Sequence, residues 1–496
     1  MGVWGGLLRH VGAQSHGGLP PFAALCRFLF PLAPTFTPAP PHLRTPTVPN
    51  NYKLFSDPVH GFISVPKGLI MALVQQPEVQ RLRRIRQLGV GHLVFPGAEH
   101  TRFNHALGAM ALMQDALAGI EGKGTPVSAT ERTAALAAAL VHDGGHGPYS
   151  HTLEQYLIRD FHHEQMSRRL LVRLADRLSG HPDGDALQLA LDIFDGAYER
   201  TFFHQLVASQ LDMDRLDYLR RDAFYTGVAE GEVGVERLLK TLRVVPSDGR
   251  ADAPVAVEEK GIYAVENFLI SRRLMYWQVY LHKTVLAGDQ LLRAAFRRVR
   301  WHFREGRDAV GDGCSPALCY FLKHRLTGDD LPDRPAATDH YAALDDTDVL
   351  FSLKQWRHAA DDPVLADLCR RFVDRDFFRV TFLPEEPSHE QLARWRSRVA
   401  RWLQENGLAR DRSSGRGSFE EAARYYLTQG RSRHSAYQRG RDEAIGIVGR
   451  DGQVRELSER ADTSALTALS ERVVKPYVCY PKEVELDLPA APASSA

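Results

Sequence analysis

The segment ALAAALVHDGGHGPYSH, Ala135–His151, constrains the structure of this chain more than any other. It begins as an apolar run of Ala and Leu, which predicts a buried helix. It then places His142 beside Asp143, breaks at two glycines, and adds His146 and His151. Because an uncompensated carboxylate is costly to bury, Asp143 requires a partner of opposite charge. Histidine is the usual proton carrier and metal ligand near neutral pH, so the segment predicts a functional site.

The pattern of the chain predicts a mainly α protein. From residue 67 to about residue 304 nearly every segment has helical periodicity. Turn-rich stretches, short alternating runs and further helices follow. We therefore predict a helical domain over residues 51–304 and a smaller α+β C-terminal region over residues 305–496. Residues 1–50 hold nine of the 28 prolines and no Asp, Glu or Lys, so we predict a disordered or mis-assigned N-terminal extension there. The apolar stretch FAALCRFLF keeps a signal or transit peptide as the less favoured alternative.

Three local patterns give sharper expectations. EVQRLRRIRQLG, residues 78–89, places apolar residues on one face and predicts a continuous helix that ends at Gly89. GRDGQ between two alternating runs predicts a β-hairpin at residues 449–453. TSALTALSERV, residues 463–473, predicts a helix.

The composition excludes some classes of protein. The formal net charge of +1 over 496 residues gives no global field toward nucleic acid or a membrane surface. No apolar run reaches the length of about 20 residues that a membrane helix requires. The odd number of cysteines, five, argues against a disulfide framework and for a reducing compartment, so we expect a cytoplasmic protein. The arginine- and tryptophan-rich segments RRVRWHFREGR and LARWRSRVARW keep single-stranded nucleic-acid binding open as an alternative.

Four residues far apart in the chain have the chemistry of a metal site. They are His105, His142, Asp143 and Asp214, each on or at the end of a predicted helix. Helices from distant segments can bring ligands to one ion in a bundle core. Two imidazoles with two carboxylates suit Fe, Mn, Zn or Ni better than Ca, with Mg as an additional ion. A single histidine of this kind is more often an ordinary core residue, so the prediction depends on the combination.

Six motifs agree in order and spacing with a known family: DPVHGFI, QRLRRIRQLG, VFPGAEHTRFNHALG, HDGGHGPYSH, HHEQ and DMDRLDYLRRD. The chain resembles the HD-domain phosphohydrolase superfamily, and within it the deoxynucleoside triphosphate triphosphohydrolase branch. The resemblance runs from about Lys53 to Lys283 and is weaker toward CYPKEV. The animal member of this branch carries a SAM domain, for which no counterpart is evident upstream.

The resemblance implies roles for individual residues. The metal ligands would be the four residues named above. The catalytic residues would be His146, His151, Glu154 and His163, with His163 as general acid. The substrate contacts would be Gln87, Leu88, Arg102, Arg215, Tyr218, Asp222, Arg272 and Tyr280. Arg215 stands where the family has a lysine. Independently of the resemblance, Asp214, Tyr218 and Asp222 are spaced four residues apart and therefore share one helix face.

The resemblance also implies regulation by nucleotides. Lys53, Gln80 and Arg83 match positions that contact an activating nucleotide, and family members form tetramers with nucleotides between subunits. Gln75 stands where the animal enzyme reads guanine with an Asp. Gln has one acceptor and one amide donor group and cannot reproduce that pairing. We therefore expect a homo-oligomer, a tetramer by resemblance, that lacks strict dependence on dGTP.

The expected reaction is metal-dependent hydrolysis of a dNTP to a deoxynucleoside and inorganic triphosphate, by attack of an activated water at the α-phosphorus. The metal site alone would equally serve an HD enzyme acting on a nucleoside monophosphate, a cyclic dinucleotide or an alarmone. Tyr218, Asp222 and the HHEQ motif favour the dNTPase over these alternatives.

Overall fold

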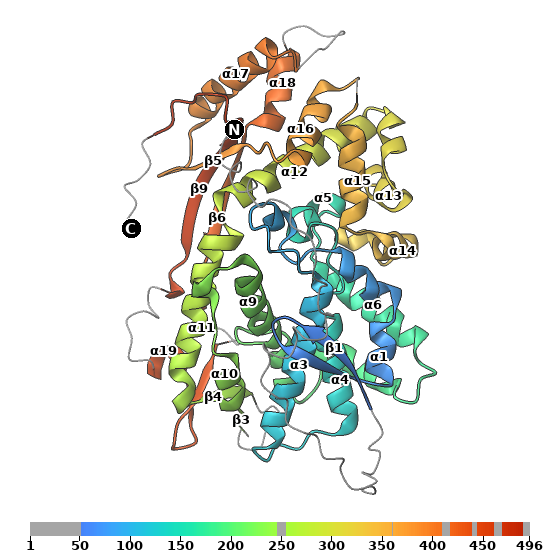
Figure 1. Ribbon diagram of the computed structural model, residues 1–496, viewed down its shortest axis with the longest axis vertical. Coiled ribbons are helices and arrows are strands. Elements are labelled where there is room, and N and C mark those ends of the chain that lie inside the picture. Colours follow the sequence, from blue (N-terminus) through green and yellow to red (C-terminus); the bar gives the residue numbers. More distant parts are fainter. Residues whose placement is uncertain are drawn as a thin grey trace, which may run out of the picture. The chain divides into compact units, whose positions relative to one another are not determined.

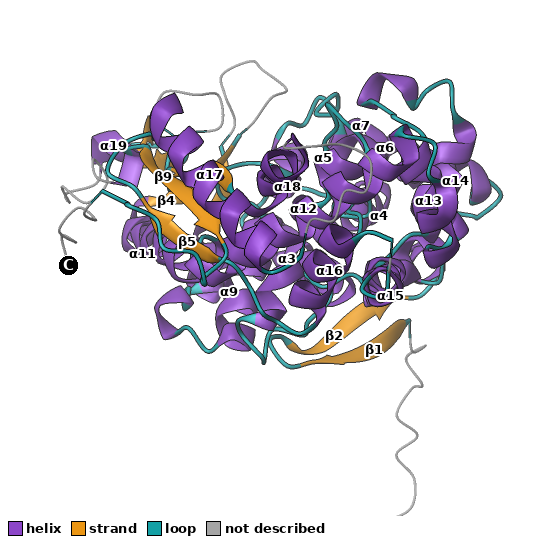
Figure 2. Ribbon diagram, turned by 90° about the horizontal axis from the view of Figure 1, so that it is seen from above, coloured by secondary structure: helices purple, strands orange, loops and turns teal. Residues whose placement is uncertain are grey.

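The computed structural model describes residues 51–245, 254–359, 361–408, 417–438, 444–460 and 469–489. The predicted extension over residues 1–50 and most of the predicted helix over residues 463–473 lie outside the described residues. The described part is mainly helical with a few small sheets (Figure 2), which confirms the predicted fold class.

The first part of the chain contains β1 (Tyr52–Asp57), β2 (Gly61–Pro66), α1 (Leu69–Val74), α2 (Pro77–Gln80), α3 (Arg102–Glu121), α4 (Ala129–Val141), α5 (Glu154–Leu157), α6 (His163–Arg177), α7 (Asp185–Phe194), α8 (Phe202–Val207), α9 (Met213–Thr226), α10 (Val235–Thr241), β3 (Leu242–Val244), β4 (Val255–Glu258), α11 (Ile262–Met275) and α12 (Lys283–Arg304). The second part contains α13 (Pro316–Lys323), α14 (Pro335–Ala343), α15 (Asp346–Trp356), α16 (Pro363–Val373), β5 (Arg379–Phe382), α17 (His389–Glu405), α18 (Gly417–Tyr426), β6 (Thr428–His434), β7 (Gly446–Val448), β8 (Val454–Glu456), α19 (Leu457–Arg460) and β9 (Val473–Tyr480).

The helices α3, α4 and α9 form the scaffold of the site (Figure 1). α4 begins at Ser128, whose hydroxyl accepts from the backbone N–H of Glu131 while the Glu131 carboxylate accepts from the Ser128 N–H. The Ala/Leu run of α4 is buried throughout, and the helix packs between α3 and α7. α9 packs against α3. The ends of these three helices therefore carry residues from distant parts of the sequence to one place.

The sheets join both parts of the chain. β1 and β2 form an antiparallel hairpin. β3, β4, β7 and β8 form one sheet in that order, in which β4 and β7 are parallel, and β5, β9 and β6 form another. β7 and β8 pair as an antiparallel hairpin with Val448 opposite Val454, which confirms the turn predicted at GRDGQ. Because β4 and β7 come from opposite sides of residue 304, the proposed domain boundary there stays a prediction.

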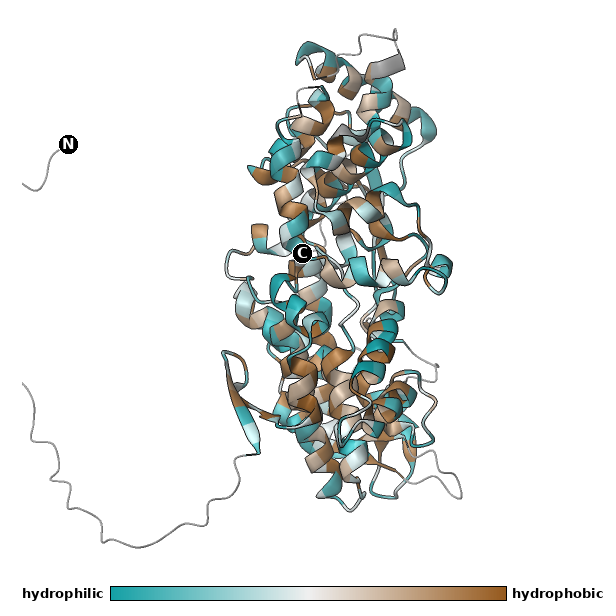
Figure 3. Ribbon diagram, turned by 90° about the vertical axis from the view of Figure 1, so that its right-hand side faces the viewer, coloured by the Kyte–Doolittle hydropathy of each residue, from teal (hydrophilic) through white to brown (hydrophobic). Residues whose placement is uncertain are grey.

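Buried apolar side chains form two clusters. One lies around α3, α4, α7, α8, α9 and α11, and the other around α12 to α17. Hydrophobic residues, brown in Figure 3, recur through the helical body, while hydrophilic residues, teal, are common in its loops. Val279 belongs to the first cluster and Tyr149 to the second, and both line the pocket described below.

The continuous helix predicted over residues 78–89 is wrong. α2 ends at Gln80, a short 3₁₀ turn follows, and Ile85 is extended with φ −119° and ψ 113°. Distant acceptors take the backbone N–H groups that would continue the helix. The N–H of Arg86 donates to Asp346 at 2.9 Å, and that of Gln87 to the His100 carbonyl at 3.0 Å.

Candidate metal centre and active site

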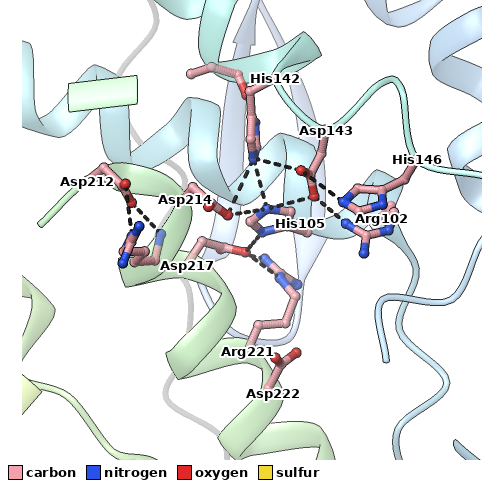
Figure 4. A network of polar contacts seen from close by, with 12 residues as sticks. Arg102, His105, His142, Asp143, His146, Asp212, Asp214, Asp217, Arg221 and Asp222 are labelled. Atoms are coloured by element: carbon pink, nitrogen blue, oxygen red, sulfur yellow. Dashed lines mark hydrogen bonds and ion pairs between the residues drawn. The ribbon is translucent and has the colours of Figure 1, made fainter. Parts of the chain in front are cut away.

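The four predicted metal ligands lie together at the ends of α3, α4 and α9 (Figure 4). One ligand atom from each of His105, His142, Asp143 and Asp214 lies within 4.8 Å of all the others. The Nε2 of His105 is 3.2 Å from Nε2 of His142 and 3.0 Å from Oδ1 of Asp214. It is 3.5 Å from Oδ2 of Asp143. Two imidazole nitrogens and two carboxylates therefore face one point.

Hydrogen bonds on the far side of each imidazole orient its ring. The Nδ1 of His105 lies 2.7 Å from Oδ2 of Asp217. The Nδ1 of His142 lies 2.7 Å from the carbonyl of Ala139. Both partners are acceptors, so each Nδ1 carries a hydrogen and each Nε2 faces the cluster. This arrangement is typical of metal-binding histidines.

The charges at the cluster fit a divalent cation. Burial alone would lower the pKa of His105, but the carboxylates of Asp214 and Asp217 raise it to about 10. Burial alone would raise the pKa of Asp214, but hydrogen bonds to His105 and His142 hold it below its usual range. The carboxylates thus draw positive charge into the site, and a metal ion would take the place of the proton. The mixed N/O donor set suits Fe, Mn, Zn or Ni.

A buried polar network supports the cluster and was missed from the sequence. Asp217 is fully buried and accepts from Nε of Arg221 at 2.9 Å. The Nε2 of His60 lies 2.5 Å from the same carboxylate. Arg221 in turn donates to Asp57 at 2.8 Å. All four residues stand in the DPVHGFI and DMDRLDYLRRD motifs. The motifs alone do not predict that Asp217 lies on the face of α9 that packs against α3.

Gly108 permits this contact between α3 and α9. A Cβ at Gly108 would lie 1.9 Å from Oδ1 of Asp217 and 2.5 Å from Nη2 of Arg221. Since real Cβ contacts are not that short, Asp217 can lie beside His105 only because position 108 is a glycine.

The four predicted catalytic residues form a second group, beside the first. The rings of His146 and His163 stack with centroids 3.6 Å apart. Oε2 of Glu154 lies 3.0 Å from Nδ1 of His151, and Oε1 lies 3.6 Å from Nδ1 of His163. Burial alone would raise the pKa of Glu154, but hydrogen bonds to these two histidines lower it. Burial and then Arg102 hold the pKa of His146 well below its usual range, so this imidazole is neutral.

The loop between α4 and α5 holds an unusual backbone. Tyr149 and Ser150 both have positive φ, 54° and 52°, which non-glycine residues seldom adopt. The N–H of Tyr149 donates to Asp346 at 2.8 Å, and the Ser150 hydroxyl accepts from Nε of Arg102 at 2.9 Å. These bonds stabilise a strained segment beside the site, where such strain is commonly found.

A pocket of about 380 Å³ connects the two groups. Its lining includes Asp143, Asp214 and three of the catalytic-group residues, His146, His151 and His163. Six of the eight predicted substrate contacts also line it: Gln87, Leu88, Arg102, Tyr218, Asp222 and Tyr280. The Oε1 of Gln87 is buried and accepts no hydrogen bond from a described residue. The volume lies within the range of about 300–1,000 Å³ that is usual for small-molecule sites.

One end of the pocket is organised around Asp222. The Tyr280 hydroxyl donates to Oδ2 of Asp222 at 2.7 Å. The Nε2 of His100 lies 2.7 Å from Oδ1, and the His100 ring stacks on Tyr225. Tyr218 meets Tyr280 edge to face at 6.2 Å. The sequence predicted Asp222, Tyr280 and Tyr218 but neither Tyr225 nor His100, although His100 stands in the motif VFPGAEHTRFNHALG.

Two of the predicted substrate contacts do not line this pocket. Neither Arg215 nor Arg272 is among its lining residues. Nε of Arg215 is 3.2 Å from Asp212, and Nη1 of Arg272 donates to the Ala436 carbonyl at 2.9 Å. Their contact with phosphate stays a prediction.

The predicted activator residues also lie elsewhere. Lys53 is exposed on β1. The guanidinium of Arg83 lies 3.7 Å from the centroid of the Phe103 ring and donates to Gln80 at 2.9 Å.

Comparison with known proteins identifies the family. A model described as "HD associated region" matches residues 233–306. The chain is 32% identical to the uncharacterised protein YwfO of Bacillus subtilis over 88% of its own length and 93% of that protein. It matches a crystal structure of a phosphohydrolase from Bacteroides thetaiotaomicron with a TM-score of 0.77 and 38% identity, over 86% of this chain and 99% of that one. The chain belongs to the HD-domain phosphohydrolase superfamily, in its dNTPase-like branch.

This HD-domain protein also resembles named dNTPases, over a shorter span. It is 30% identical to the SAMHD1 homologue of Dictyostelium discoideum, a deoxynucleoside triphosphate triphosphohydrolase, over 49% of each protein. The chain thus spans about half the length of that relative. Together these findings make the chain a hydrolase of phosphoric esters. Among its described residues no helix is both long and apolar enough to cross a membrane.

Proposed function

We propose that this HD-domain protein hydrolyses dNTPs to deoxynucleosides and inorganic triphosphate. One observation carries the proposal. A single pocket of about 380 Å³ joins the carboxylates of the metal cluster, the stacked histidines, and an end formed by Tyr218, Asp222 and Tyr280. A nucleotide needs these three environments, for its phosphates, its leaving oxygen and its sugar.

The residues of the metal cluster would hold a divalent cation through His105, His142, Asp143 and Asp214. When bound, such an ion supplies Lewis-acid polarisation of a phosphoryl oxygen and a water of lowered pKa. Arg102 lies beside the cluster and donates through Nη1 to Asp143 and through Nε to Ser150. Its Nη2 is therefore the group that would meet a phosphoryl oxygen and stabilise charge that develops there.

The histidines of the second group would supply the proton for the leaving group and orient the reacting groups. Protonated His163 would give its proton to the 5′-oxygen that leaves, as a general acid. The carboxylate of Glu154, 3.6 Å from Nδ1 of His163, would stabilise the imidazolium before that transfer. Neutral His146, stacked on the same ring, would accept a hydrogen bond from the water or orient a phosphate, as would His151.

The other end of the pocket would bind the deoxyribose. Tyr280 and His100 already donate to Asp222, one to each oxygen. A carboxylate has about four lone-pair sites, so Asp222 would retain capacity for the 3′-hydroxyl. The unpaired Oε1 of Gln87 would accept from the same sugar or from the base.

The test is product analysis with purified protein, each dNTP and added Mn²⁺, Fe²⁺, Zn²⁺, Ni²⁺ or Mg²⁺. Phosphorus NMR separates triphosphate from pyrophosphate and phosphate, and chromatography detects the deoxynucleoside. Triphosphate in equal amount to deoxynucleoside is the expected result. Hydrolysis of nucleoside monophosphates, cyclic dinucleotides or an alarmone, without attack on any dNTP, would replace the proposal with one of those HD activities.

Assembly and regulation belong to the same proposal. We infer a homo-oligomer, a tetramer by resemblance, and an activating nucleotide bound by Lys53, Gln80 and Arg83. Exposed Lys53 and Arg83 leave two cationic groups accessible to a phosphate, which supports this proposal. A cytoplasmic location stays a prediction, and single-stranded nucleic acid stays the alternative partner.

A further inference from the structure

A separate cavity of about 490 Å³ lies where α5, α12 and α18 meet. In Figure 1, α12 passes between α5 and α18. The cavity shares no lining residue with the active-site pocket. Six arginines line it: Arg159, Arg297, Arg300, Arg304, Arg325 and Arg424. We call it the arginine pocket. Part of it comes from RRVRWHFREGR, the basic segment that the active site does not use.

The positive charge of the arginine pocket is largely uncompensated. Among the described residues only Arg304 of these six forms an ion pair, with its neighbour Glu305 at 3.2 Å. The one acidic residue that lines the pocket is the exposed Glu421. The Nε atoms of Arg297 and Arg300 are buried without a hydrogen-bond partner in the described structure. Arg297 and Arg300 are half-buried, and the other four arginines are exposed at the rim. Guanidinium groups that converge in this way repel one another and favour an anion.

Two of the three aromatic residues that line the arginine pocket, Trp301 and Tyr425, contact guanidinium groups, and Tyr156 is the third. The Trp301 ring contacts Arg298 at 4.0 Å and Arg307 at 5.1 Å from its centroid. The Tyr425 ring contacts Arg297 at 5.9 Å and Arg298 at 5.3 Å. These are cation–π distances, so the rings are engaged with arginines. Beside these two rings the arginines of the lining offer N–H donors, which match phosphate oxygens in bidentate geometry.

We propose that the arginine pocket binds the polyphosphate group of a small molecule. The shared chemistry is two or more adjacent phosphates, carried by inorganic triphosphate or by a nucleoside polyphosphate.

Arg300 links this pocket to the catalytic histidines. Its Nη2 donates to the carbonyls of Tyr156 and Leu157 at the end of α5, the second at 3.1 Å. α5 begins at Glu154, which lies 3.0 Å from His151 and accepts from the N–H of His163 at 2.9 Å. An anion that draws Arg300 toward itself acts on the helix that holds both histidines. Occupancy of the arginine pocket therefore changes kcat, an expectation that rests on the proposed function.

Binding is tested by calorimetry with inorganic triphosphate and the full-length protein. The double variant Arg159→Gln/Arg424→Gln removes two exposed guanidiniums and spares Arg300. Arg243→Gln/Arg401→Gln, at two exposed positions outside the pocket, makes the same charge change. Arg102→Gln reports on the active site. We expect a binding event that the pocket variant weakens at least tenfold, that the control retains, and that Arg102→Gln retains. Equal melting temperatures establish that the variants fold.

Three results would overturn the proposal. The first is unchanged triphosphate affinity in the pocket variant. The second is loss of every binding event in Arg102→Gln, which would assign all the triphosphate to the active site. The third is binding of single-stranded oligonucleotide through these arginines without any binding of triphosphate. Similar affinities of the pocket for inorganic triphosphate and a non-hydrolysable dNTP support recognition of phosphate alone, while strict need for the nucleoside contradicts it.

The link to catalysis has its own readout. Triphosphate is added during dNTP hydrolysis by the wild type, the pocket variant and the charge-matched control. We expect kcat to change in the wild type and in the control, and to stay constant in the pocket variant. Failure of the proposed dNTPase activity would remove this readout and leave the calorimetric test intact, so the two failures are distinguishable.

Discussion

The Nδ1 of His105 lies 2.7 Å from Oδ2 of Asp217, and both side chains are fully buried. Asp217 is not among the four residues that face the metal position. It acts through His105, because its carboxylate holds the imidazole in the tautomer whose Nε2 lone pair faces the cluster. Arg221 and His60 fix Asp217 in turn. We therefore expect the metal affinity of the cluster to depend on Asp217, although this residue is not one of its four proposed ligands.

Asp217→Asn should lower metal affinity about 10- to 100-fold, the usual effect of removing such a partner from a ligand histidine. The amide has nearly the shape of the carboxylate, but it is neutral and makes the imidazole a poorer ligand. Competition with a chromophoric chelator measures the affinity. Asp192→Asn on α7, outside this network, is the control. Equal affinity in wild type and Asp217→Asn would show that the negative charge of Asp217 does not make His105 a better ligand.

Gly108→Ala should lower both metal affinity and stability. The new methyl group would overlap Asp217, and such overpacking typically costs about 1–3 kcal/mol. Gly119→Ala on the same helix is the matched control, because its Cβ would come no closer than 3.5 Å to a neighbouring atom. That control should be neutral or stabilising by up to about 1 kcal/mol, since alanine favours helix. Urea titration measures the stability of both variants, and metal analysis measures their metal content. Unchanged stability and metal content in Gly108→Ala would mean that α3 and α9 can move apart without weakening the protein or the cluster.

His163→Ala should retain metal and substrate affinity while kcat falls. Loss of one general acid typically costs about 10² to 10⁴ in rate. Metal analysis, KM and kcat for the same preparation separate these effects. A fall in metal content parallel to the fall in activity would make His163 a ligand and remove the role proposed for it.

The sequence predicted that His105, His142, Asp143 and Asp214 lie together, because its motifs carry them directly, and the structure confirms this grouping. It did not predict how helices turn against one another. Asp217 stands three residues after Asp214, and only the packing of α9 on α3 shows that it meets His105. Ile85 breaks a well-formed helical pattern because Asp346, more than 250 residues away in the chain, binds the N–H of Arg86. Long-range contacts of this kind leave no signal in local periodicity.

Hydrolysis should not require dGTP. Gln75 is exposed at the end of α1, and an amide cannot accept from both guanine N–H groups as a carboxylate does. An unpaired donor at a desolvated interface costs about 1–3 kcal/mol. We expect hydrolysis of dATP, dCTP and dTTP without a guanine nucleotide, either with each dNTP alone or with another dNTP as the activator. Gln75→Asp should gain stimulation by a non-hydrolysable dGTP analogue, and Gln76→Asp, its neighbour, should not. Absolute dependence of the wild type on the guanine nucleotide would contradict this role for Gln75.

His434 should make stability sensitive to pH. Its ring stacks on Tyr276 with centroids 3.7 Å apart, beside the active-site pocket that Tyr276 lines. Burial first, and then Arg272 and Arg273, lower the pKa of His434 from 6.5 to about 4. The folded protein therefore holds this imidazole neutral, while the unfolded chain takes up a proton below pH 6.5. The stabilisation is complete above pH 6.5 and is lost as the pH falls toward 4.

This difference in pKa between the folded and unfolded states corresponds to about 3 kcal/mol in the free energy of unfolding, because each pKa unit represents about 1.4 kcal/mol. His434→Phe keeps an aromatic ring on Tyr276 and removes the titrating group. Its free energy of unfolding should therefore fall less steeply than that of the wild type between pH 6.5 and 4. His340→Phe, at a histidine that stacks on Tyr320 instead, is the matched substitution. Urea titrations at half-unit pH intervals measure the slopes, and parallel curves for wild type and His434→Phe would show that His434 takes up its proton in the folded state as readily as in the unfolded one.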